Sequence, residues 1–349
     1  MTTPSGVPVR PLLPGLYHVV PMTPDRVVVA NARRMVALSG PGFTARVTPF
    51  LTALDGTSTA EELEARFPEF APAVLGALSA KGLLVDAGSA DRSSPGPKLA
   101  ALALPGAPSP AVAVTRLASA TVVVVGCAAV GGAVAVLLAK AGAGRLVLAD
   151  GDAVAERDVA VSPVLQPSDA GRGRAEAVAR QCRDAGATVE FADPPADAIR
   201  PDLAVVQLAY GTAGNAADQF LAGRIPYLVH SQDALEAGVG PLVWAPGDPC
   251  HRCLATRRLG HVAHGDEYLA YVEHRAATSP TPDAFLAAQV AVVAGLVAAE
   301  ALRALLDADP LSRGAFLALD LARPTVVREV LLPVPGCPGC STSPVGAER

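Results

Sequence analysis

The stretch TVVVVGCAAVGGAVAVLLAKAGAGRLVLADGD, residues 121–152, decides the fold. A short run of β-branched residues leads into a glycine-containing turn, then into a stretch of small helix-forming residues, and then into a second apolar run. Continuous β-branched runs are typical of parallel strands that are covered on both faces. The stretch therefore predicts a strand, a helix and a second parallel strand, the repeating unit of a doubly wound α/β fold.

The turn GCAAVGG follows the first predicted strand directly. Gly126 would permit the tight reversal, and Gly131 and Gly132 would let backbone approach a phosphate and let the helix pack closely on the sheet. Ala128 stands where the second glycine of the usual dinucleotide fingerprint would be. Asp150 ends the second strand, where a ribose-binding carboxylate is expected. The turn is compatible with a nucleotide site, and equally with small residues that serve only strand–helix packing.

The same rhythm continues along the chain. Residues 202–209 and 225–231 are predicted to be further parallel strands around a helix at 215–224. Residues 314–334 read as two more strands, antiparallel, that lead into PGCPGC. We therefore expect a Rossmann-like domain over residues 116–349.

The chain before this domain has a different pattern. Thr59 and Glu62 form a possible capping box for one of three helical stretches. Residues 89–115, rich in Pro, Gly and Ser, read as a linker. Residues 1–88 are thus predicted to be a small α+β, winged-helix-like domain. Its expected strands are residues 15–21, 25–31 and 34–40, and its expected helices are residues 44–56, 59–67 and 70–86.

The chain has six cysteines, and four of them form two C-x-x-C pairs. Four thiolates are the ligand set of a tetrahedral structural zinc ion, and they leave no position for a catalytic water. The alternative is a pair of disulfides or redox dithiols. Cys127 and Cys182 read as buried thiols rather than nucleophiles. The expected zinc ligands are Cys250, Cys253, Cys337 and Cys340.

Composition limits the function classes. The net charge is -5, and the Lys and Arg residues are scattered, so the basic stripe of a nucleic-acid binder is absent. The N-terminus shows no secretory pattern, so we expect a cytoplasmic protein. The apolar stretch at residues 284–306 is interrupted by Gln289, Gly295, Glu300 and Arg303, and we expect a buried helix there rather than a membrane span.

With the strand–turn–helix of residues 121–152, then DAGRGRAEAVA, GDPCHRCL and CPGC, the second domain resembles the ThiF/MoeB family of ubiquitin-activating-type adenylyltransferases over about Thr121–Cys340. The resemblance implies a Rossmann-like fold, a homodimer and a tetrathiolate zinc. Active members adenylate a partner's C-terminal carboxylate with ATP and magnesium.

Departures from the family pattern carry the functional inference. Where the family has an Asn, an Arg and a Gln that grip the triphosphate, this chain has Asp158, Val161 and Ser162. Arg174 keeps a basic position, and the magnesium-holding Asp matches Ala209. Since these groups stabilise the charge of nucleotidyl transfer, we expect no adenylation, no bound ATP or Mg²⁺ and no catalytic residue. The vestigial nucleotide site would comprise Gly126, Gly131, Gly132, Asp150, Asp152 and Arg174.

The first domain resembles, in element order and length, the PqqD-like leader-peptide recognition domain of ribosomal peptide natural-product (RiPP) pathways. Its fusion to a degenerate ThiF-like domain resembles the partners that present precursor peptides to YcaO cyclodehydratases. An edge strand at residues 34–40 and the third helix would bind an extended peptide. The alternative for the apolar helix residues is that they form the domain's own core. The expected peptide-binding residues are Arg33, Arg34, Met35, Val36, Leu38, Val74, Leu75, Leu78 and Lys81.

Three functions follow from these patterns. The first is a noncatalytic protein that binds a precursor leader peptide for a YcaO-type enzyme in azoline- or thiopeptide-type RiPP biosynthesis. The second is a working ThiF-type adenylyltransferase or sulfur-transfer activator with unusual ATP contacts. The third, an NAD-dependent dehydrogenase, uses only the glycine turn and leaves the four paired cysteines unexplained.

Overall fold

The computed structural model describes residues 7–31, 35–87, 104–108, 110–192, 200–208, 216–233, 235–278 and 286–341. The chain divides into two compact units, Met1–Thr115 and Arg116–Arg349, and each is described by itself. Helix α5 (Pro110–Ser119) begins inside the stretch predicted to be a linker, so the end of that stretch is helical. Residues 89–103 and 109 of the predicted linker lie outside the described residues.

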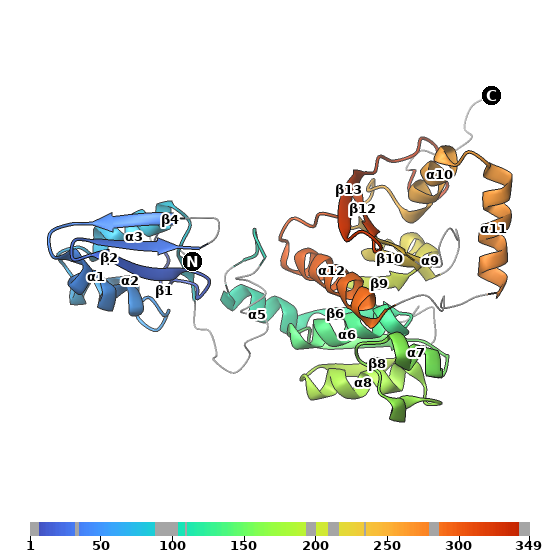
Figure 1. Cartoon of the computed structure of the whole chain (residues 1–349), viewed down its shortest axis with the longest axis horizontal. Coiled ribbons are helices and arrows are strands. Elements are labelled where there is room, and N and C mark those ends of the chain that lie inside the picture. The colour runs from blue at the N-terminus through green and yellow to red at the C-terminus, as the bar shows by residue number, and fades with distance from the viewer. Residues whose placement is uncertain are drawn as a thin grey trace. The chain divides into compact units, whose positions relative to one another are not determined.

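Unit 1 contains a three-stranded antiparallel sheet in the order β2-β3-β4 (Figure 1). The predicted three strands and three helices are present, and the predicted capping box is confirmed, because Thr59 and Glu62 each accept a hydrogen bond from the other's backbone N–H. The strands are β2 (His18–Thr23), β3 (Arg26–Ala30) and β4 (Met35–Ser39), with a two-residue pairing of β1 (Pro11–Leu12) and β5 (Val85–Asp86). The helices are α1 (Phe43–Thr52), α2 (Ala60–Arg66) and α3 (Ala71–Ala80).

The core of unit 1 lies between one face of this sheet and the helices. Val27 and Val29 of β3 are fully buried there. The ring of Phe50 packs edge-on against Phe67, with centroids 5.4 Å apart. Leu75 of α3 is fully buried in the same cluster. These apolar contacts hold the helices on the sheet.

Unit 2 is an α/β unit built on an eight-stranded sheet in the order β13-β12-β11-β10-β9-β6-β7-β8. Five consecutive strands of the sheet are parallel and the other three are antiparallel, so the predicted mostly parallel sheet and antiparallel tail are confirmed. The parallel strands are β6 (Thr121–Val125), β7 (Arg145–Ala149), β8 (Thr188–Phe191), β9 (Leu203–Gln207) and β10 (Tyr227–Asp233). The others are β11 (Glu236–Val243), β12 (Ala315–Asp320) and β13 (Thr325–Val330).

Helices cover both faces of the unit 2 sheet, as expected for a doubly wound fold. On one face α6 lies beside α12 and α8 (Figure 1). A Cβ at Gly131 would lie 1.8 Å from the carbonyl oxygen of Gly126, so this glycine is required for the close fit of α6 on the turn. The helices of that face are α6 (Ala129–Lys140), α7 (Glu156–Val161), α8 (Arg174–Asp184) and α12 (Ala287–Leu306). The other face is covered by α9 (Ala216–Ala222) and α10 (His251–His261). Helix α11 (Gly265–Thr278) packs on α10.

Helix α12 is the one described helix that is long and apolar enough to cross a membrane, with a mean hydropathy of 1.7. Half of it is buried inside unit 2. Val293, Val297 and Ala301 are fully buried against α6 and the sheet. The helix packs as the sequence predicts for a helix in the interior of a globular unit.

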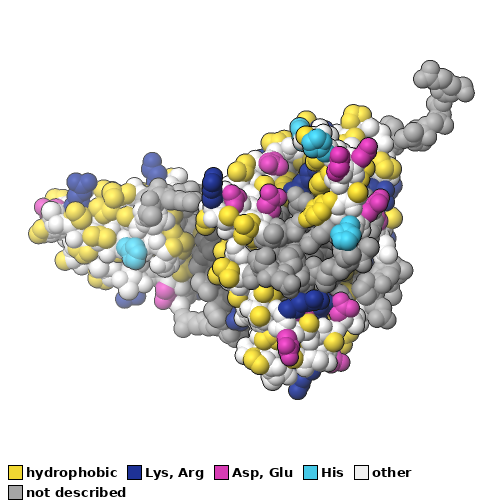
Figure 2. Space-filling view, turned by 45° about the vertical axis from the view of Figure 1, so that its right-hand side comes forward, with side chains coloured by type: hydrophobic (Ala, Val, Ile, Leu, Met, Phe, Trp, Pro, Cys, Tyr) yellow, Lys and Arg dark blue, Asp and Glu magenta, His cyan; other side chains and the backbone are white. Residues whose placement is uncertain are grey.

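Charges are mixed on the surface. On the face that Figure 2 shows, Lys and Arg side chains are dispersed and lie among Asp and Glu. No stripe of basic side chains is visible among the described residues on this face.

Candidate functional site

The strand register brings four chain positions into one row at the carboxyl ends of the parallel strands. Ala149 pairs with Val125, Val125 with Val206, and Gln207 with His230. The residues that follow β7 and β6 therefore extend the row from Asp150 through Gly126 to Gln207 and His230. The strand order reverses between β6 and β9, and open α/β sheets bind ligands at the carboxyl ends beside such a switch point. This row is the candidate site.

The glycine turn in this row is held by Asp150. Gly126 has φ of 87°, and a Cβ there would lie 3.1 Å from Oε1 of Gln207. Asp150 accepts a hydrogen bond from the N–H of Cys127 at 2.7 Å through Oδ2, and one from the N–H of Asp152 at 2.9 Å through Oδ1. Only 7% of its side chain is exposed. Asp150, expected to face a ribose, therefore uses both oxygens to fix the turn.

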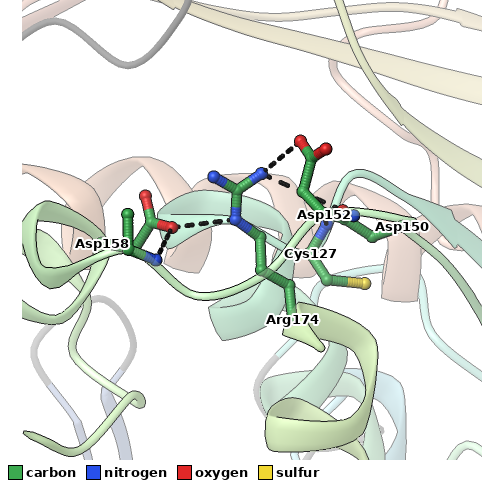
Figure 3. Close-up of polar contacts among 6 residues, drawn as sticks. Cys127, Asp150, Asp152, Asp158 and Arg174 are labelled. Atoms are coloured by element: carbon green, nitrogen blue, oxygen red, sulfur yellow. Dashed lines mark hydrogen bonds and ion pairs between the residues drawn. The ribbon is translucent and has the colours of Figure 1, made fainter. Parts of the chain in front are cut away.

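Arg174 lies in a cluster of carboxylates next to this turn (Figure 3). Its Nε donates to Oδ2 of Asp158 at 2.9 Å, and its Nη1 donates to Oδ2 of Asp152 at 2.8 Å. Oδ1 of Asp150 lies 3.9 Å from the same Nη1. Three of the predicted site residues, Asp150, Asp152 and Arg174, are thus brought together, and Asp158 joins them.

The positive charge of Arg174 is already paired with the carboxylates of this cluster. Burial alone would lower the pKa of Arg174, but the ion pairs with Asp158, Asp150 and Asp152 outweigh burial and raise it. Asp158 is fully buried and also accepts from the N–H of Ala155 at 2.9 Å, while its Oδ1 has no hydrogen-bond partner in the part of the chain that the structure describes. Three carboxylates surround one guanidinium, so the cluster carries a net negative charge. The cluster therefore carries no excess positive charge.

Two other positions that match the family's triphosphate-binding residues make contacts within the protein. Val161 is buried in the apolar core of unit 2. The hydroxyl of Ser162 accepts from the N–H groups of Val164 and Leu165, at 3.2 Å each. Ala209 lies outside the described residues. Among the described residues, the two substituted positions therefore offer no cation to a phosphate.

The two unpaired cysteines of unit 2 are buried thiols. Burial raises the pKa of Cys127 far above its ordinary value, and burial raises that of Cys182 to about 12. Since the thiolate is the nucleophile, neither sulfur is activated. This supports the interpretation of both residues as small core side chains.

A cavity of about 390 Å³ lies beside Asp150. Phe191 at the end of β8 and Glu176 of α8 form two of its walls. The cavity has room for a nucleoside, but its ionisable lining, Asp150 and Glu176, is acidic.

The four paired cysteines form one cluster at the opposite edge of the sheet. Their sulfurs all lie within 4.8 Å of one another, and Cys250, Cys253 and Cys337 are buried. The Sγ atoms of Cys253 and Cys340 are 3.3 Å apart and those of Cys250 and Cys337 are 3.7 Å apart, well beyond the length of a disulfide. This arrangement is that of a metal site, and it could hold an ion such as zinc.

Hydrogen bonds around the cluster support this assignment. The N–H of Val334 donates to Sγ of Cys253 at 3.3 Å. Burial opposes ionisation of Cys337, but hydrogen bonds from the backbone of Cys340 and Gly339 outweigh burial and lower its pKa to about 7. Cys250, in contrast, has its pKa raised by burial. Three of the four cysteines are buried, and one cation would neutralise the four sulfurs together.

His251, next to Cys250, orients this region. Its Nε2 lies 3.0 Å from Oδ1 of Asp218, and its Nδ1 lies 2.9 Å from the hydroxyl of Tyr227. Tyr227 is the first residue of β10, so the cluster lies at the amino end of the strand whose carboxyl end carries His230. The metal site therefore lies toward the amino ends of the parallel strands, whereas the glycine turn follows the carboxyl end of β6.

The expected peptide-binding residues of unit 1 fall into three groups. Met35 is 73% exposed on β4, which is an edge strand among the described residues, whereas Val36 and Leu38 point toward the core. Arg33 and Arg34 lie outside the described residues, and Lys81 follows α3. Val74, Leu75 and Leu78 are at most 4% exposed, so they form the core and offer no surface to a peptide. The packing therefore favours the alternative interpretation, in which these three residues form the core of unit 1.

The sequence did not single out the polar end of β10. Both ring nitrogens of His230 and both amide atoms of Gln232 are buried and have no hydrogen-bond partner among the described residues. His230 is 1% exposed, and burial lowers its pKa to about 4. The sequence does carry a signal for it, since YLVHSQD ends in four consecutive polar residues after an apolar start.

The profile of the ThiF family matches residues 102–340. This chain belongs to the ThiF family. The match includes the glycine turn, the Arg174 cluster and all four paired cysteines of this ThiF family member. A search of curated proteins finds no significant match.

Solved structures share the fold at low identity. Escherichia coli MccB, solved with ATP, is 16% identical, with a TM-score of 0.72 over 95% of this chain and 99% of that one. The microcin C7 biosynthetic enzyme MccB in complex with N-formylated MccA is 17% identical, with a TM-score of 0.72 and the same coverage. PaaA is 18% identical, with a TM-score of 0.63 over 92% of this chain and 100% of that one.

Proposed function

We propose that this protein is a noncatalytic partner in RiPP biosynthesis that binds the leader segment of a precursor peptide and presents the precursor to a YcaO-type cyclodehydratase. The observation that carries the proposal is the engagement of Arg174 by Asp150, Asp152 and Asp158. The remaining basic group of the family's phosphate grip is thereby neutralised. Since oriented cations supply much of the stabilisation of nucleotidyl transfer, the pocket is unsuited to adenylation.

Unit 1 provides the peptide-binding half of the proposal, as a PqqD-like winged-helix domain. Strand β4 has one partner, β3, and its other edge is open among the described residues. An extended leader peptide would pair with this edge through backbone hydrogen bonds and contact Met35 with its side chains. Tethering the leader then raises the effective concentration of the core peptide at the modifying enzyme. The likeness to MccB, solved with N-formylated MccA, supports a role in peptide maturation.

A structural zinc ion bound by the four paired cysteines is also part of the proposal. We assign them a structural zinc ion because a tetrathiolate set is filled by the ion and leaves no open position. The ion would join the segment before α10 to the C-terminal CPGC. A cytoplasmic homodimer, as in active family members, is part of the same proposal.

The second candidate is a working ATP-dependent adenylyltransferase or sulfur-transfer activator. The cavity beside Asp150 and the likeness to MccB solved with ATP favour this candidate. ATP–pyrophosphate exchange separates the two functions. Exchange by the wild-type chain alone, lost in Asp152→Ala, would establish the enzyme and refute the noncatalytic proposal; Asp152 is chosen because its side chain is 76% exposed.

The direct test uses a candidate precursor peptide, chosen from the short reading frames beside this protein's gene. A fluorescent peptide that carries only the leader is titrated with the full chain, and binding is followed by anisotropy. We expect saturable binding that the unlabelled leader reverses and that ATP does not change. No binding of the leader, with a folded zinc-loaded protein, would exclude the proposed function.

A further inference from the structure

A cavity of about 220 Å³ lies on the face of the unit 2 sheet that α10 covers. Leu208 and Val229 line it from the sheet, and Leu254, Leu259 and Leu269 line it from α10 and α11. It is separate from the Arg174 cluster, which lies at the end of β7 on the other face. Neither the proposed zinc site nor the proposed leader site uses this cavity.

The floor of the cavity is a fixed aromatic ring. Phe316 of β12 is 1% exposed, and the tip of its ring lies over Gly238 of β11, where a Cβ would be 1.9 Å from Cζ. The guanidinium of Arg258 stacks over the same ring at 4.3 Å from its centroid. The ring is held between a glycine backbone and a cation, so the cavity is preformed.

Three hydroxyl groups line the cavity, and that of Thr256 donates to the carbonyl oxygen of Arg252 at 2.9 Å, which leaves those of Ser231 and Tyr268. Ser231 is on β10 and Tyr268 is in the first turn of α11. Neither hydroxyl has a hydrogen-bond partner among the described residues. A hydroxyl both donates and accepts, so the pair can satisfy the N–H and C=O of one peptide group.

The position of the cavity connects it to the candidate site. Leu208 directly follows β9, and Ser231 neighbours His230 near the carboxyl end of β10. Ligands of open α/β sheets bind at this edge beside the switch point. A chain that crosses this edge can therefore place one side chain in the cavity.

We propose that this cavity receives one apolar or aromatic side chain of the polypeptide that the protein presents, with the hydroxyls of Ser231 and Tyr268 bound to the adjoining peptide group. The inference rests on the proposed function and adds a second, side-chain-selective contact outside unit 1. The volume suits one leucine- or phenylalanine-sized side chain. Arg258 repels Lys and Arg side chains, so selection is for uncharged apolar residues.

The first test uses small probes on the full zinc-loaded chain. N-acetyl-leucine methylamide and N-acetyl-phenylalanine methylamide are titrated by saturation-transfer NMR, with the glycine and lysine analogues as controls. We expect the apolar probes to bind at least ten times more tightly than the glycine and lysine probes. Equal binding of all four would overturn the inference.

Variants locate the probe. Ala255→Phe fills the cavity from α10, and Ala255→Ser is the matched control that leaves it open. We expect the first to weaken leucine-probe binding at least tenfold and the second to change it less than twofold. Leu269→Asp, at a position 43% exposed, provides an independent block if Ala255→Phe does not fold. Unchanged probe binding in a folded blocked variant contradicts the assignment.

Leader binding by the same variants separates this inference from the proposed function. Leader affinity that is unchanged in Ala255→Phe, with loss of the leucine probe, supports both. Leader binding without any selective probe binding overturns the cavity assignment alone. Selective probe binding without leader binding overturns the proposed function and leaves an apolar side-chain pocket in unit 2.

Discussion

Nε of Arg174 lies 2.9 Å from Oδ2 of Asp158, and the Asp158 carboxylate is fully buried. A buried charge that loses its partner is strongly destabilising, by about 3–5 kcal/mol. We therefore expect Arg174→Ala to destabilise unit 2 by about 3 kcal/mol, measured by urea unfolding.

Arg145→Ala is the control for that variant. Arg145 pairs with Glu190, but both side chains are more than 40% exposed. Exposed pairs contribute little to stability because solvent screens them, so this variant should unfold almost as the wild type does. Equal effects of the two substitutions would show that Arg174 is not a structural ion pair.

The cysteine cluster predicts a metal dependence. We expect about one zinc per chain by elemental analysis, and a large fall in the melting temperature of unit 2 after chelation, because metal binding contributes free energy to folding. Cys250→Ser should lower the zinc content and the melting temperature. Cys182→Ser alters a buried thiol outside the cluster, so its zinc content should stay at the wild-type level. Wild-type protein without zinc would refute the assignment.

His230 predicts a pH dependence of stability. Burial lowers its pKa from 6.5 to about 4. Between these values the unfolded chain binds a proton that the folded chain does not, so stability falls as pH decreases from about 6.5 to about 4. At the lower end this loss is about 3 kcal/mol.

His230→Leu should remove that acid sensitivity and stabilise the protein at neutral pH by about 1–3 kcal/mol, because two unpartnered buried nitrogens disappear. His251→Leu provides the contrast, since both of its ring nitrogens are hydrogen-bonded and its loss should destabilise. Urea unfolding at pH 7 and pH 5 measures both effects. A stability loss at pH 7 in His230→Leu would indicate that His230 has a partner in solution.

The β4 edge predicts an asymmetric response of leader binding. Met35 on β4 is 73% exposed and Met22 on β2, the opposite edge of the same sheet, is 59% exposed. Met35→Glu should weaken leader binding at least tenfold, because it places a charge at the proposed contact. Met22→Glu should change it less than twofold. A larger effect of Met22→Glu would move the peptide to the β2 edge.

Sequence patterns predicted the elements whose signals are local. The β-branched run of β6 and the C-x-x-C pairs needed no distant information. Strand β11 was not predicted, because its sequence EAGVGPLV contains two glycines and a proline, residues that are depleted in strands. Gly238 is explained only by the ring of Phe316, which comes from a distant strand. Tertiary packing decided this element.

The candidate site was predictable in its parts but not in its connections. Asp150, Asp152 and Arg174 were singled out from the family pattern, yet their mutual neutralisation depends on the path of α7, which brings in Asp158. Helix α11 was not predicted from the sequence, because Val272 is its one buried residue among those described and the helix therefore carries little periodic signal. Long-range pairing and weakly amphipathic helices lie beyond local reasoning.

Because the cysteine cluster lies apart from the glycine turn, the residues that stabilise unit 2 differ from those that form its candidate site. Substitutions at the carboxyl ends of the strands can accumulate without loosening the sulfur cluster that fastens the C-terminal segment. A protein with this arrangement can change its function while it keeps its fold.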